Sequence, residues 1–575
     1  MTARWILPPP LSPGEAAYAE ALAGELGCPA SLAAILARRG REHPGEAADF
    51  LTPRLKRLAD PFLLPEMRAA VDRTLAAVDR GEPIVLYGDY DVDGVSSLAL
   101  LARVLRALGA APRMFLPSRT DEGYGLSRDG IARCLADGRP GLLVAVDCGT
   151  SSAAEIADLA AQGVDVVILD HHECQDALPL CTALVNPKRP GAAPGFENLC
   201  SAGLVFKFCH ALLKTRPSPE VDLRDYLDLV ALGTVADIVP LTGENRILVW
   251  KGLEVLSRTR WVGLQALLEI AQVQARLTPS DIGFKLGPRL NAAGRLGEAG
   301  AALELLLTED PGRARALAQE LDAQNRERQR VERATVAEAQ AQLDFDPARD
   351  AAIVVGAEGW HPGVLGIAAS RLCRAHSRPA LVIGFDASGL GRGSGRSIAG
   401  FSLVEALGNC APWLEKFGGH EMAAGLELRR ERFEAFRGAF LDFARAALTD
   451  ADFQPRLALD GEAALSDISL DFLSVHERMQ PFGTGNAQPL FLARGVRPAG
   501  PPAVLKEKHL RLALEQRGAR RDAIFFNGAA DPLPRPPWDV AFHIERNEWR
   551  GRVNVQIQIR HIRAAEESPL SPPSP

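Results

Sequence analysis

The chain has 575 residues, 47% hydrophobic and 24% charged, which is a globular balance and too long for one ordinary domain. It contains no run of about 18 apolar residues, the length that a membrane-spanning helix needs. Residues 454–565 carry sixteen Lys/Arg against twelve Asp/Glu, a net charge of +4, whereas residues 1–453 carry −9. A basic module beside an acidic body hints at a polyanionic ligand, although such small excesses are also common on solvated surfaces.

The N-terminal 75 residues are expected to form a helical, irregular arm. Prolines at positions 8, 9, 10 and 13 stand where a signal peptide needs an apolar core. The nine cysteines include no C-x-x-C pair, which excludes a zinc knuckle and argues against a disulfide framework. Cys174 and Cys181 also fit no zinc spacing, so core packing is the preferred interpretation for nearly all cysteines. We therefore expect a cytoplasmic protein without a membrane partner.

Short apolar runs then alternate with helical patterns. Strands are predicted at Ile84–Tyr87, 113–116, 142–146 and 164–169, and helices at 97–108 and 153–162. Strands separated by helices of this length indicate parallel β-α-β units with right-handed crossovers. Polar residues that act on a ligand should gather at the carboxyl ends of these strands.

Carboxylates follow four apolar runs. The motifs are Gly88-Asp89-Tyr90-Asp91-Val92-Asp93-Gly94, Val146-Asp147-Cys148-Gly149, Leu169-Asp170-His171-His172-Glu173 and Thr234-Val235-Ala236-Asp237-Ile238. One such motif alone is more simply explained as a turn or a helix cap. Four together, one with an Asp-His-His triplet, favour a centre for hard divalent cations such as Mn²⁺ or Mg²⁺. Two such ions about 3.5–4 Å apart can stabilise the attacking and leaving oxygens in phosphoester hydrolysis.

The second half of the chain changes character three times. A long polar helix rich in Ala, Arg, Gln and Glu is predicted from Pro311, as a connector rather than a core element. A second α/β unit starts near Ala352, and short alternating strands after Arg456 indicate a small β-barrel or sandwich. The predicted division is an arm (1–75), an α/β domain (76–310), a connecting helix (311–345), a second α/β domain (346–450), a β domain (454–565) and a disordered tail (566–575).

The four carboxylate motifs closely resemble those of the DHH phosphoesterase superfamily, in the order of its RecJ branch of single-strand-specific 5′→3′ DNA exonucleases. Similar segments continue to residue 562: EGYGLS (122–127), GPRLNAAGRL (287–296), GWHPGVLGIAASRL (359–372), GSGRSI (393–398), FGGHEMAAG (417–425) and PFGTGN (481–486). The resemblance implies an α/β protein in which a DHH domain and a DHH-associated domain are joined by the long helix. A small β-barrel resembling an oligonucleotide-binding (OB) fold follows them.

The resemblance also implies two ions and their ligands. Asp91 and Asp147 bind one ion, whereas Asp93, Asp147, His171 and Asp237 bind the other, so that Asp147 bridges them.

Three further residues gain roles from the same resemblance. Small-substrate members of the superfamily carry a His where this chain has Tyr87, which favours the RecJ branch and leaves the first ion's ligands open. Asp89 is then an auxiliary ligand or positions water. Asp170 is expected to orient a neighbouring imidazole, and His172 to face the scissile phosphate.

Candidate DNA and phosphate contacts lie in three regions. Close glycines let backbone N–H groups approach phosphate, and an arginine can bind it through two hydrogen bonds. The candidates are Arg119, Arg289, Arg295, Ser394, Arg396, Gly418, Gly419 and His420, and in the β domain Lys506, Lys508 and Arg511. A solvated loop is the alternative for the glycine-rich segments, and His361 could either bind DNA or close a loop.

The resulting hypothesis is a two-metal exonuclease that degrades single-stranded DNA from its 5′ end in recombination and repair. Its implied partners are single-stranded DNA, single-stranded-DNA-binding protein and a helicase. One alternative is a phosphodiesterase for oligonucleotides or cyclic dinucleotides, against which the separate β domain argues. The other is an inactive scaffold at replication forks, against which the intact acidic and histidine motifs argue.

Overall fold

In a computed structural model, the described residues are 3–25, 27–39, 44–118, 122, 125–175, 177–273, 276–296, 299–549 and 551–565. The chain divides into two compact units. Unit 1 contains residues 59–239 and 243–455, and unit 2 contains residues 3–58, 240–242 and the chain from residue 456 onward. No helix in these described ranges is long and apolar enough to cross a membrane. All nine cysteines are free and seven are buried.

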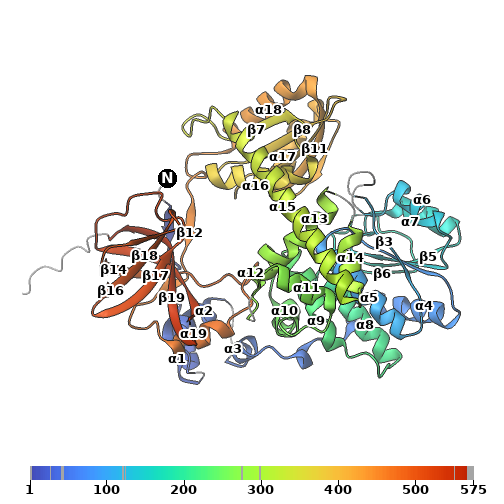
Figure 1. The fold of residues 1–575 in the computed structure, drawn as a ribbon, viewed down its shortest axis with the longest axis horizontal. Helices are drawn as coiled ribbons and strands as arrows, with labels where there is room; N and C mark the ends of the chain where they lie inside the picture. The colour runs from blue at the N-terminus through green and yellow to red at the C-terminus, as the bar shows by residue number, and fades with distance from the viewer. Residues whose placement is uncertain are drawn as a thin grey trace, which may run out of the picture. The chain divides into compact units, whose positions relative to one another are not determined.

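The first sheet of unit 1 is parallel, with strand order β3-β2-β4-β5-β6. Its strands are β2 (Ile84–Tyr87), β3 (Arg113–Phe115), β4 (Leu142–Val146), β5 (Asp165–Leu169) and β6 (Ala183–Val185). The helices around it are α4 (Met67–Asp79), α5 (Val92–Ala107), α6 (Arg128–Ala136) and α7 (Ala153–Ala161). Figure 1 shows α6 and α7 on one side of this sheet and α4 and α5 on the other. The chain leaves β2 toward β3 and returns on its other side to β4, so the carboxyl ends of these strands form a topological switch point.

Helix α5 begins five residues earlier than the sequence pattern predicts. The prediction placed its start at Ser97, but it begins at Val92 because the Asp91 carboxylate accepts a hydrogen bond from the Gly94 N–H at 3.0 Å. This cap satisfies one of the free N–H groups of the first turn. Asp93 therefore lies on the first turn of the helix rather than in a loop.

A helical layer follows the first sheet. Its elements are η2 (Pro61–Leu63), α8 (Ser201–Thr215), η3 (Leu223–Tyr226), α9 (Leu227–Ala236), α10 (Gly243–Leu256), α11 (Val262–Ile270), α12 (Pro279–Asp281), the π-helical turn η4 (Ile282–Leu286), α13 (Gly287–Leu296) and α14 (Gly300–Leu307). Helix α9 is buried over Leu227–Thr234. Its burial fixes the position of Asp237, the residue that caps its C-terminal end.

The predicted long helix is α15 (Pro311–Ala341). Its composition predicted a connector rather than a core element, and the structure shows that it also buries polar side chains. Arg328 lies 2.8 Å from Glu332, and Arg371 of the following domain lies 2.5 Å from the same carboxylate. The helix is thus a packed part of unit 1.

The second sheet of unit 1 has the order β10-β11-β9-β8-β7 and is antiparallel except for the pair β7–β8. Its strands are β7 (Ile353–Glu358), β8 (Ala380–Phe385), β9 (Leu390–Arg396), β10 (Lys416–Gly419) and β11 (Ala423–Arg429). The helices are α16 (Pro362–His376), α17 (Leu403–Asn409), η5 (Ala411–Trp413), η6 (Arg430–Arg432) and α18 (Phe433–Ala447). Phe436 and Phe440 of α18 are fully buried in its core.

Unit 2 contains a closed β-barrel, as expected of an OB-like domain. Its strand order is β13-β14-β18-β19-β17-β16-β15, and a pairing of β14 with β16 closes it. The strands are β13 (Gly461–Glu462), β14 (Phe491–Pro498), β15 (Ala503–Leu505), β16 (His509–Gln516), β17 (Ala519–Phe525), β18 (Trp538–Trp549) and β19 (Arg552–Ala564), with helix α19 (Leu470–Arg478). Closure leaves only the short strands β13 and β15 at the ends of the sheet, which limits the free edges that invite aggregation.

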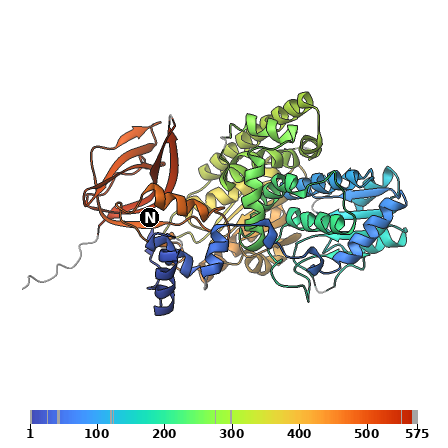
Figure 2. The ribbon, with the colours of Figure 1, turned by 90° about the horizontal axis from the view of Figure 1, so that it is seen from below.

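The N-terminal segment shares a hydrophobic core with this barrel. It comprises β1 (Arg4–Ile6), α1 (Pro13–Glu25), α2 (Ala30–Arg38), α3 (Pro44–Leu51) and η1 (Leu55–Arg57). Leu32 and Leu36 belong to the same buried cluster as Phe472 and Phe542, and these helices lie beside the barrel in both views (Figures 1 and 2). The domain boundaries drawn from the sequence, which treat residues 1–75 as one arm, stay a prediction.

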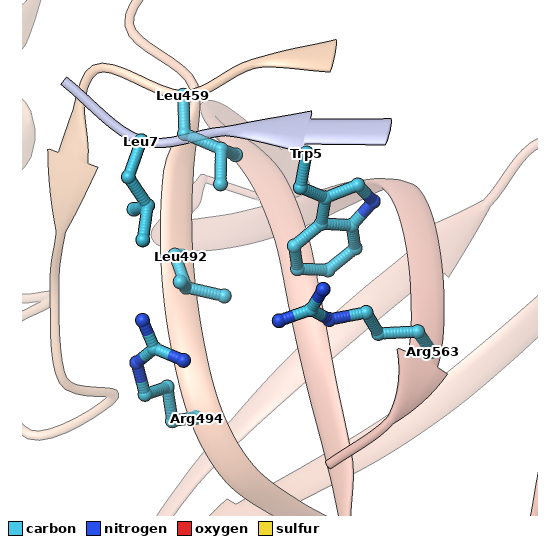
Figure 3. Close-up of a pocket in the computed structure, with 6 residues that line it drawn as sticks. All are labelled: Trp5, Leu7, Leu459, Leu492, Arg494 and Arg563. Atoms are coloured by element: carbon cyan, nitrogen blue, oxygen red, sulfur yellow. The ribbon is translucent and has the colours of Figure 1, made fainter. Parts of the chain in front are cut away.

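Strand β1 pairs with β12 (Arg456–Ala458) and covers an outer face of the barrel. Figure 3 shows a pocket of about 200 Å³ at this place, lined by Trp5, Leu7, Leu459, Leu492, Arg494 and Arg563. The guanidinium groups of Arg494 and Arg563 lie 3.6 and 3.2 Å from the buried Asp539 carboxylate. The ion pairs hold Arg494 and Arg563 within the barrel, and the packing of Arg563 on the Trp5 ring fastens β1 to it.

Candidate metal centre

Asp93 is held where β2 meets α5 by the N-terminus of another helix. Its two carboxylate oxygens accept hydrogen bonds from the N–H groups of Ser201 and Ala202 at 2.7 and 2.8 Å, at the start of α8. Free N–H groups and the helix dipole favour a negative charge there. Gly94 is required beside it, because a side chain would collide with the backbone of Asp89.

Asp147 follows β4 with a φ of +64°, a left-handed conformation that Asp tolerates better than most residues. Its side chain is buried, and Oδ1 accepts a hydrogen bond from the Ser201 hydroxyl at 2.8 Å. Sequence reasoning missed Ser201, which is the first residue of α8. Ser201 supports Asp93 through its backbone and Asp147 through its side chain, so it fixes the distance between these two carboxylates.

Asp170 and the two histidines follow β5. The Asp170 carboxylate accepts hydrogen bonds from the N–H groups of Thr150 at 3.0 Å and His171 at 2.8 Å. The Nδ1 atom of His172 lies 2.7 Å from Asp170 Oδ1. Asp170 therefore orients the His172 ring, and it belongs to none of the three groups of possible metal-ligating atoms found among the described residues.

Three carboxylates converge on the imidazole of His171. Nε2 of His171 lies 3.3 Å from Asp147 Oδ1, 3.6 Å from Asp237 Oδ2 and 3.9 Å from Asp93 Oδ2. Nevertheless, this buried nitrogen forms no hydrogen bond with any residue that the structure describes. The atoms could ligate a metal in three groups: Asp93–His171–Asp237, Asp147–His171–His172 and Asp89–Asp91–Asp147.

The electrostatics of the cluster favour a cation. Burial, followed by repulsion between the carboxylates, raises the pKa of Asp93 to about 7 and that of Asp237 to about 8. The same causes raise the pKa of Asp147 well above its usual value. Burial lowers the pKa of His171 to about 3, so its ring is neutral and offers a lone pair. Converging carboxylates and a neutral imidazole with an unused nitrogen fit a divalent cation.

The pKa values of Asp170 and His172 shift in the directions that favour their charged forms, unlike those of the converging carboxylates and His171. Burial alone would raise the pKa of Asp170, but the hydrogen bond and charge of His172 lower it. Conversely, burial alone would lower the pKa of His172, but Asp170 raises it. Asp170 thus favours the protonated form of His172, which is suited to face a phosphate.

Tyr87 does not join the cluster. It is fully buried, and its hydroxyl donates a hydrogen bond to the carbonyl oxygen of Gly125 at 3.2 Å. Asp89 and Asp91 group with Asp147 instead.

Ser394 and Arg396 lie on β9 against the first turns of α16. Nη1 of Arg396 donates to Ser394 Oγ at 3.2 Å and to the Gly395 carbonyl oxygen at 2.7 Å. A Cβ on Gly366 of α16 would lie 3.0 Å from Ser394 Oγ, so a glycine keeps this corner open. His361 caps α16 by accepting the Gly363 N–H at 3.1 Å, which favours its loop-closing interpretation.

The other arginines and the GGH motif occupy different places. Arg295 donates to the Gly363 carbonyl oxygen at 3.1 Å, whereas Arg289 is committed to Asp322 of α15 at 2.9 Å. Arg119 lies outside the described residues. Gly418 and Gly419 are exposed on β10. The hydrogen bond from Lys188 is the main cause that lowers the pKa of Glu173, the residue that follows His172. The charge of His420 lowers it further.

In the barrel, Lys506, Lys508 and Arg511 are exposed. Lys506 and Glu507 have φ values of +49° and +60°, so Lys506 lies in the hairpin turn between β15 and β16 rather than on a strand. Trp538 is buried in the core of the barrel. Phe526 remains exposed.

Family models match three parts of the chain: the N-terminal domain of the DHH family at residues 83–234, the DHHA1 domain at 350–446 and the RecJ OB domain at 459–561. The single-stranded-DNA-specific exonuclease RecJ of Bacillus subtilis is 35% identical over 93% of this chain and 68% of its own length. That of Dickeya dadantii is 36% identical over 93% and 96%. The crystal structure of RecJ with Mn²⁺ from Thermus thermophilus matches with a TM-score of 0.81 and 32% identity, covering 98% of this chain and 80% of that one.

Proposed function

The chain belongs to the RecJ family of single-stranded-DNA-specific exonucleases, and on this premise we propose that it removes nucleotides from the 5′ end of single-stranded DNA. It is a metal-dependent phosphodiester hydrolase that uses Mn²⁺ or Mg²⁺, the ions of the related structures. The single observation that carries the proposal is the convergence of Asp93, Asp147 and Asp237 on Nε2 of His171.

The residues of this chain would hold two ions, with Asp147 shared between them. Asp93, His171 and Asp237 form one group of ligating atoms, and Asp89 and Asp91 form another with Asp147. Ions held there supply Lewis-acid activation of water and stabilise the negative charge that develops at phosphorus. The N-terminus of α8 and Ser201 fix the carboxylates in advance, which reduces the reorganisation needed during the reaction.

His172 would hold the scissile phosphate. Its hydrogen bond with Asp170 favours the protonated ring and leaves Nε2 as a donor. Its side chain is 41% exposed, so a phosphate oxygen can reach it. A charge-assisted hydrogen bond there strengthens as charge develops on that oxygen.

The 5′ polarity would come from Ser394 and Arg396. Their side chains lie together on β9 beside the first turns of α16. A guanidinium and a hydroxyl are suited to bind the terminal phosphate of a 5′ end, which is doubly charged, whereas an internal phosphate carries a single charge. His420 and the exposed glycines of β10 would add contacts from the same domain.

The OB-like barrel would bind the strand beyond the cleaved end. Lys506, Lys508 and Arg511 can neutralise backbone phosphates, and Phe526 offers an exposed ring for stacking. Single-stranded-DNA-binding protein and a helicase are the proposed partners, in DNA recombination and repair in the cytoplasm. A cyclic-dinucleotide phosphodiesterase or an inactive scaffold explains less, because neither needs both this barrel and an intact set of ligands.

A substrate panel tests the proposal. Equal concentrations of 5′-phosphorylated single-stranded DNA, blunt duplex, circular single strand and a dinucleotide are incubated with Mn²⁺. We expect rapid release of mononucleotides from the linear single strand alone. Comparable digestion of the circle or the duplex would contradict end-dependent, single-strand-specific hydrolysis, and turnover of the dinucleotide alone would favour the phosphodiesterase.

A further inference from the structure

Ile238, which follows Asp237, has an unfavourable conformation. Its φ is +62°, in the left-handed region that crowds Cβ against the backbone. A β-branched residue is a genuine outlier there. Of the non-glycine residues with positive φ in the described ranges, Ile238 is the only β-branched one. Some gain elsewhere must offset this strain.

Other helices of unit 1 show what this position ordinarily requires. A left-handed residue directly after the C-cap ends a helix, and glycine takes that conformation most easily. Helices α4, α5, α6 and α7 all end in this way, with Gly81, Gly109, Gly138 and Gly163. Helix α9 ends in the same way, with Asp237 as its C-cap, but has Ile238 in place of the glycine.

Folding supplies no gain that explains the isoleucine. Its side chain is 72% exposed, whereas both neighbours, Asp237 and Val239, are half-buried. An exposed isoleucine removes little apolar surface from water when the chain folds. The strained residue therefore gains little from packing that glycine would lose.

The position of Ile238 indicates where the gain arises. It is joined to Asp237, whose Oδ2 lies 3.6 Å from Nε2 of His171 in the metal cluster. Consecutive Cα atoms are about 3.8 Å apart, so the isoleucine stands at the rim of that cluster. Strained backbone is typically retained at such functional sites.

We infer that Ile238 is a substrate-contacting residue whose side chain packs against the sugar and base of the nucleotide next to the scissile phosphate. The inference rests on the proposed function, which places that phosphate at the cluster. The C–H groups of the sugar and the face of the base are the apolar parts of a nucleotide, and an exposed aliphatic side chain complements them. Glycine or asparagine would relieve the backbone but would offer no such contact.

The substitution Ile238→Gly separates stability from activity. Relief of the left-handed strain should raise the Tm of the protein by about 1–3 °C. Loss of the apolar contact should lower kcat/KM on 5′-phosphorylated single-stranded DNA about tenfold, mainly through KM. The Kd for Mn²⁺ should not change, because Asp237 keeps its place. Ile238→Val, which keeps a branched apolar side chain, should retain most of the activity.

Gln272→Gly is the matched control. Gln272 is an exposed residue with a φ of +50° directly after the C-cap of α11. We expect the same small rise in Tm and unchanged kinetics. A loss of activity in both variants would show a general effect of flexibility and would contradict the inference.

Two substrate measurements complete the test. The first measures kcat/KM on a substrate whose 5′ nucleotide lacks its base. If Ile238→Gly no longer lowers kcat/KM on this substrate, the side chain contacts the base; if the fall persists, it contacts the sugar. Fluorescence anisotropy of a 5′-phosphorylated hexanucleotide in EDTA should show a Kd about five- to tenfold higher for Ile238→Gly. Unchanged kcat/KM and Kd, a fall in Tm, or a weaker Mn²⁺ affinity would overturn the inference. Failure of the wild type to digest single-stranded DNA would instead refute the proposed function, while the anisotropy comparison would still test the contact.

Discussion

The metal cluster should make the metal-free protein more stable as the pH falls from 8 to 5.5. Asp93 has its pKa raised to about 7 by burial first and by Asp91 second, and burial raises that of Asp237 to about 8. Below these values the folded protein binds protons that the unfolded chain releases, since an unfolded Asp has a pKa of about 3.9. Stability from these groups therefore falls as the pH rises through the folded pKa values, the reverse of the usual carboxylate behaviour.

The magnitude follows from the pKa change. For Asp93 a rise from 3.8 to about 7 corresponds to about 4 kcal/mol, at about 1.36 kcal/mol for each tenfold change in the dissociation constant. We expect a gain of at least about 2 kcal/mol on acidification in EDTA. Urea unfolding at the two pH values measures it, and comparison with Asp147→Asn isolates the cluster from other titrating groups.

Asn is the suitable replacement because it tolerates the left-handed φ of +64° and keeps an acceptor for Ser201. The metal-free variant should be more stable than the metal-free wild type at pH 8, with a smaller dependence on pH. Saturating Mn²⁺ should stabilise the wild type at pH 8 and leave the variant almost unchanged. Metal-free wild type that loses stability relative to Asp147→Asn on acidification would refute this reasoning.

Three further predictions concern other parts of the chain. Glu244→Gln should destabilise unit 1 by about 3–5 kcal/mol in urea unfolding. The reason is that the buried Lys207 ammonium, which lies 2.7 Å from the Glu244 carboxylate, loses its counter-charge. The exposed control Glu254→Gln should cost less than about 0.5 kcal/mol. Arg396→Ala should reduce the preference for 5′-phosphorylated over 5′-hydroxyl ends in paired rate assays, and an unchanged ratio would remove it from end recognition. A triple variant that replaces Lys506, Lys508 and Arg511 with Ala should lose three phosphate contacts. The slope of log K against log salt should then become shallower by about 2 in anisotropy titrations, whereas an unchanged slope would make these basic residues irrelevant to binding.

Local patterns were enough to predict four of the five strands of the first sheet and the positions of the acidic motifs, but β6 (Ala183–Val185) was missed. Each carboxylate motif follows an apolar run, and parallel strands bring such ends together, so Asp93, Asp147 and His171 could be expected at one edge of the sheet. The start of α5 was missed because it depends on a single side-chain cap, that of Asp91 on Gly94. A helical period marks the middle of a helix better than its ends.

Contacts between distant segments could not be read from local patterns. Ser201 supports Asp147 from 54 positions away, and nothing in its own neighbourhood indicates that contact. Arg289, a predicted phosphate contact, forms an ion pair with Asp322 from 33 positions away, which its own neighbourhood does not indicate. Ile238 gave no signal at all, because its importance lies in a backbone conformation that the letter sequence does not express.

A titration of the metal-free protein with Mn²⁺ by isothermal calorimetry tests the central claim most directly. If Asp147 bridges two ions, the wild type should bind two Mn²⁺ per chain, His171→Ala should retain one, and Asp147→Asn should lose high-affinity binding of both. Binding of a single ion by the wild type would contradict the two-metal centre, as would two ions bound with unchanged affinity by Asp147→Asn.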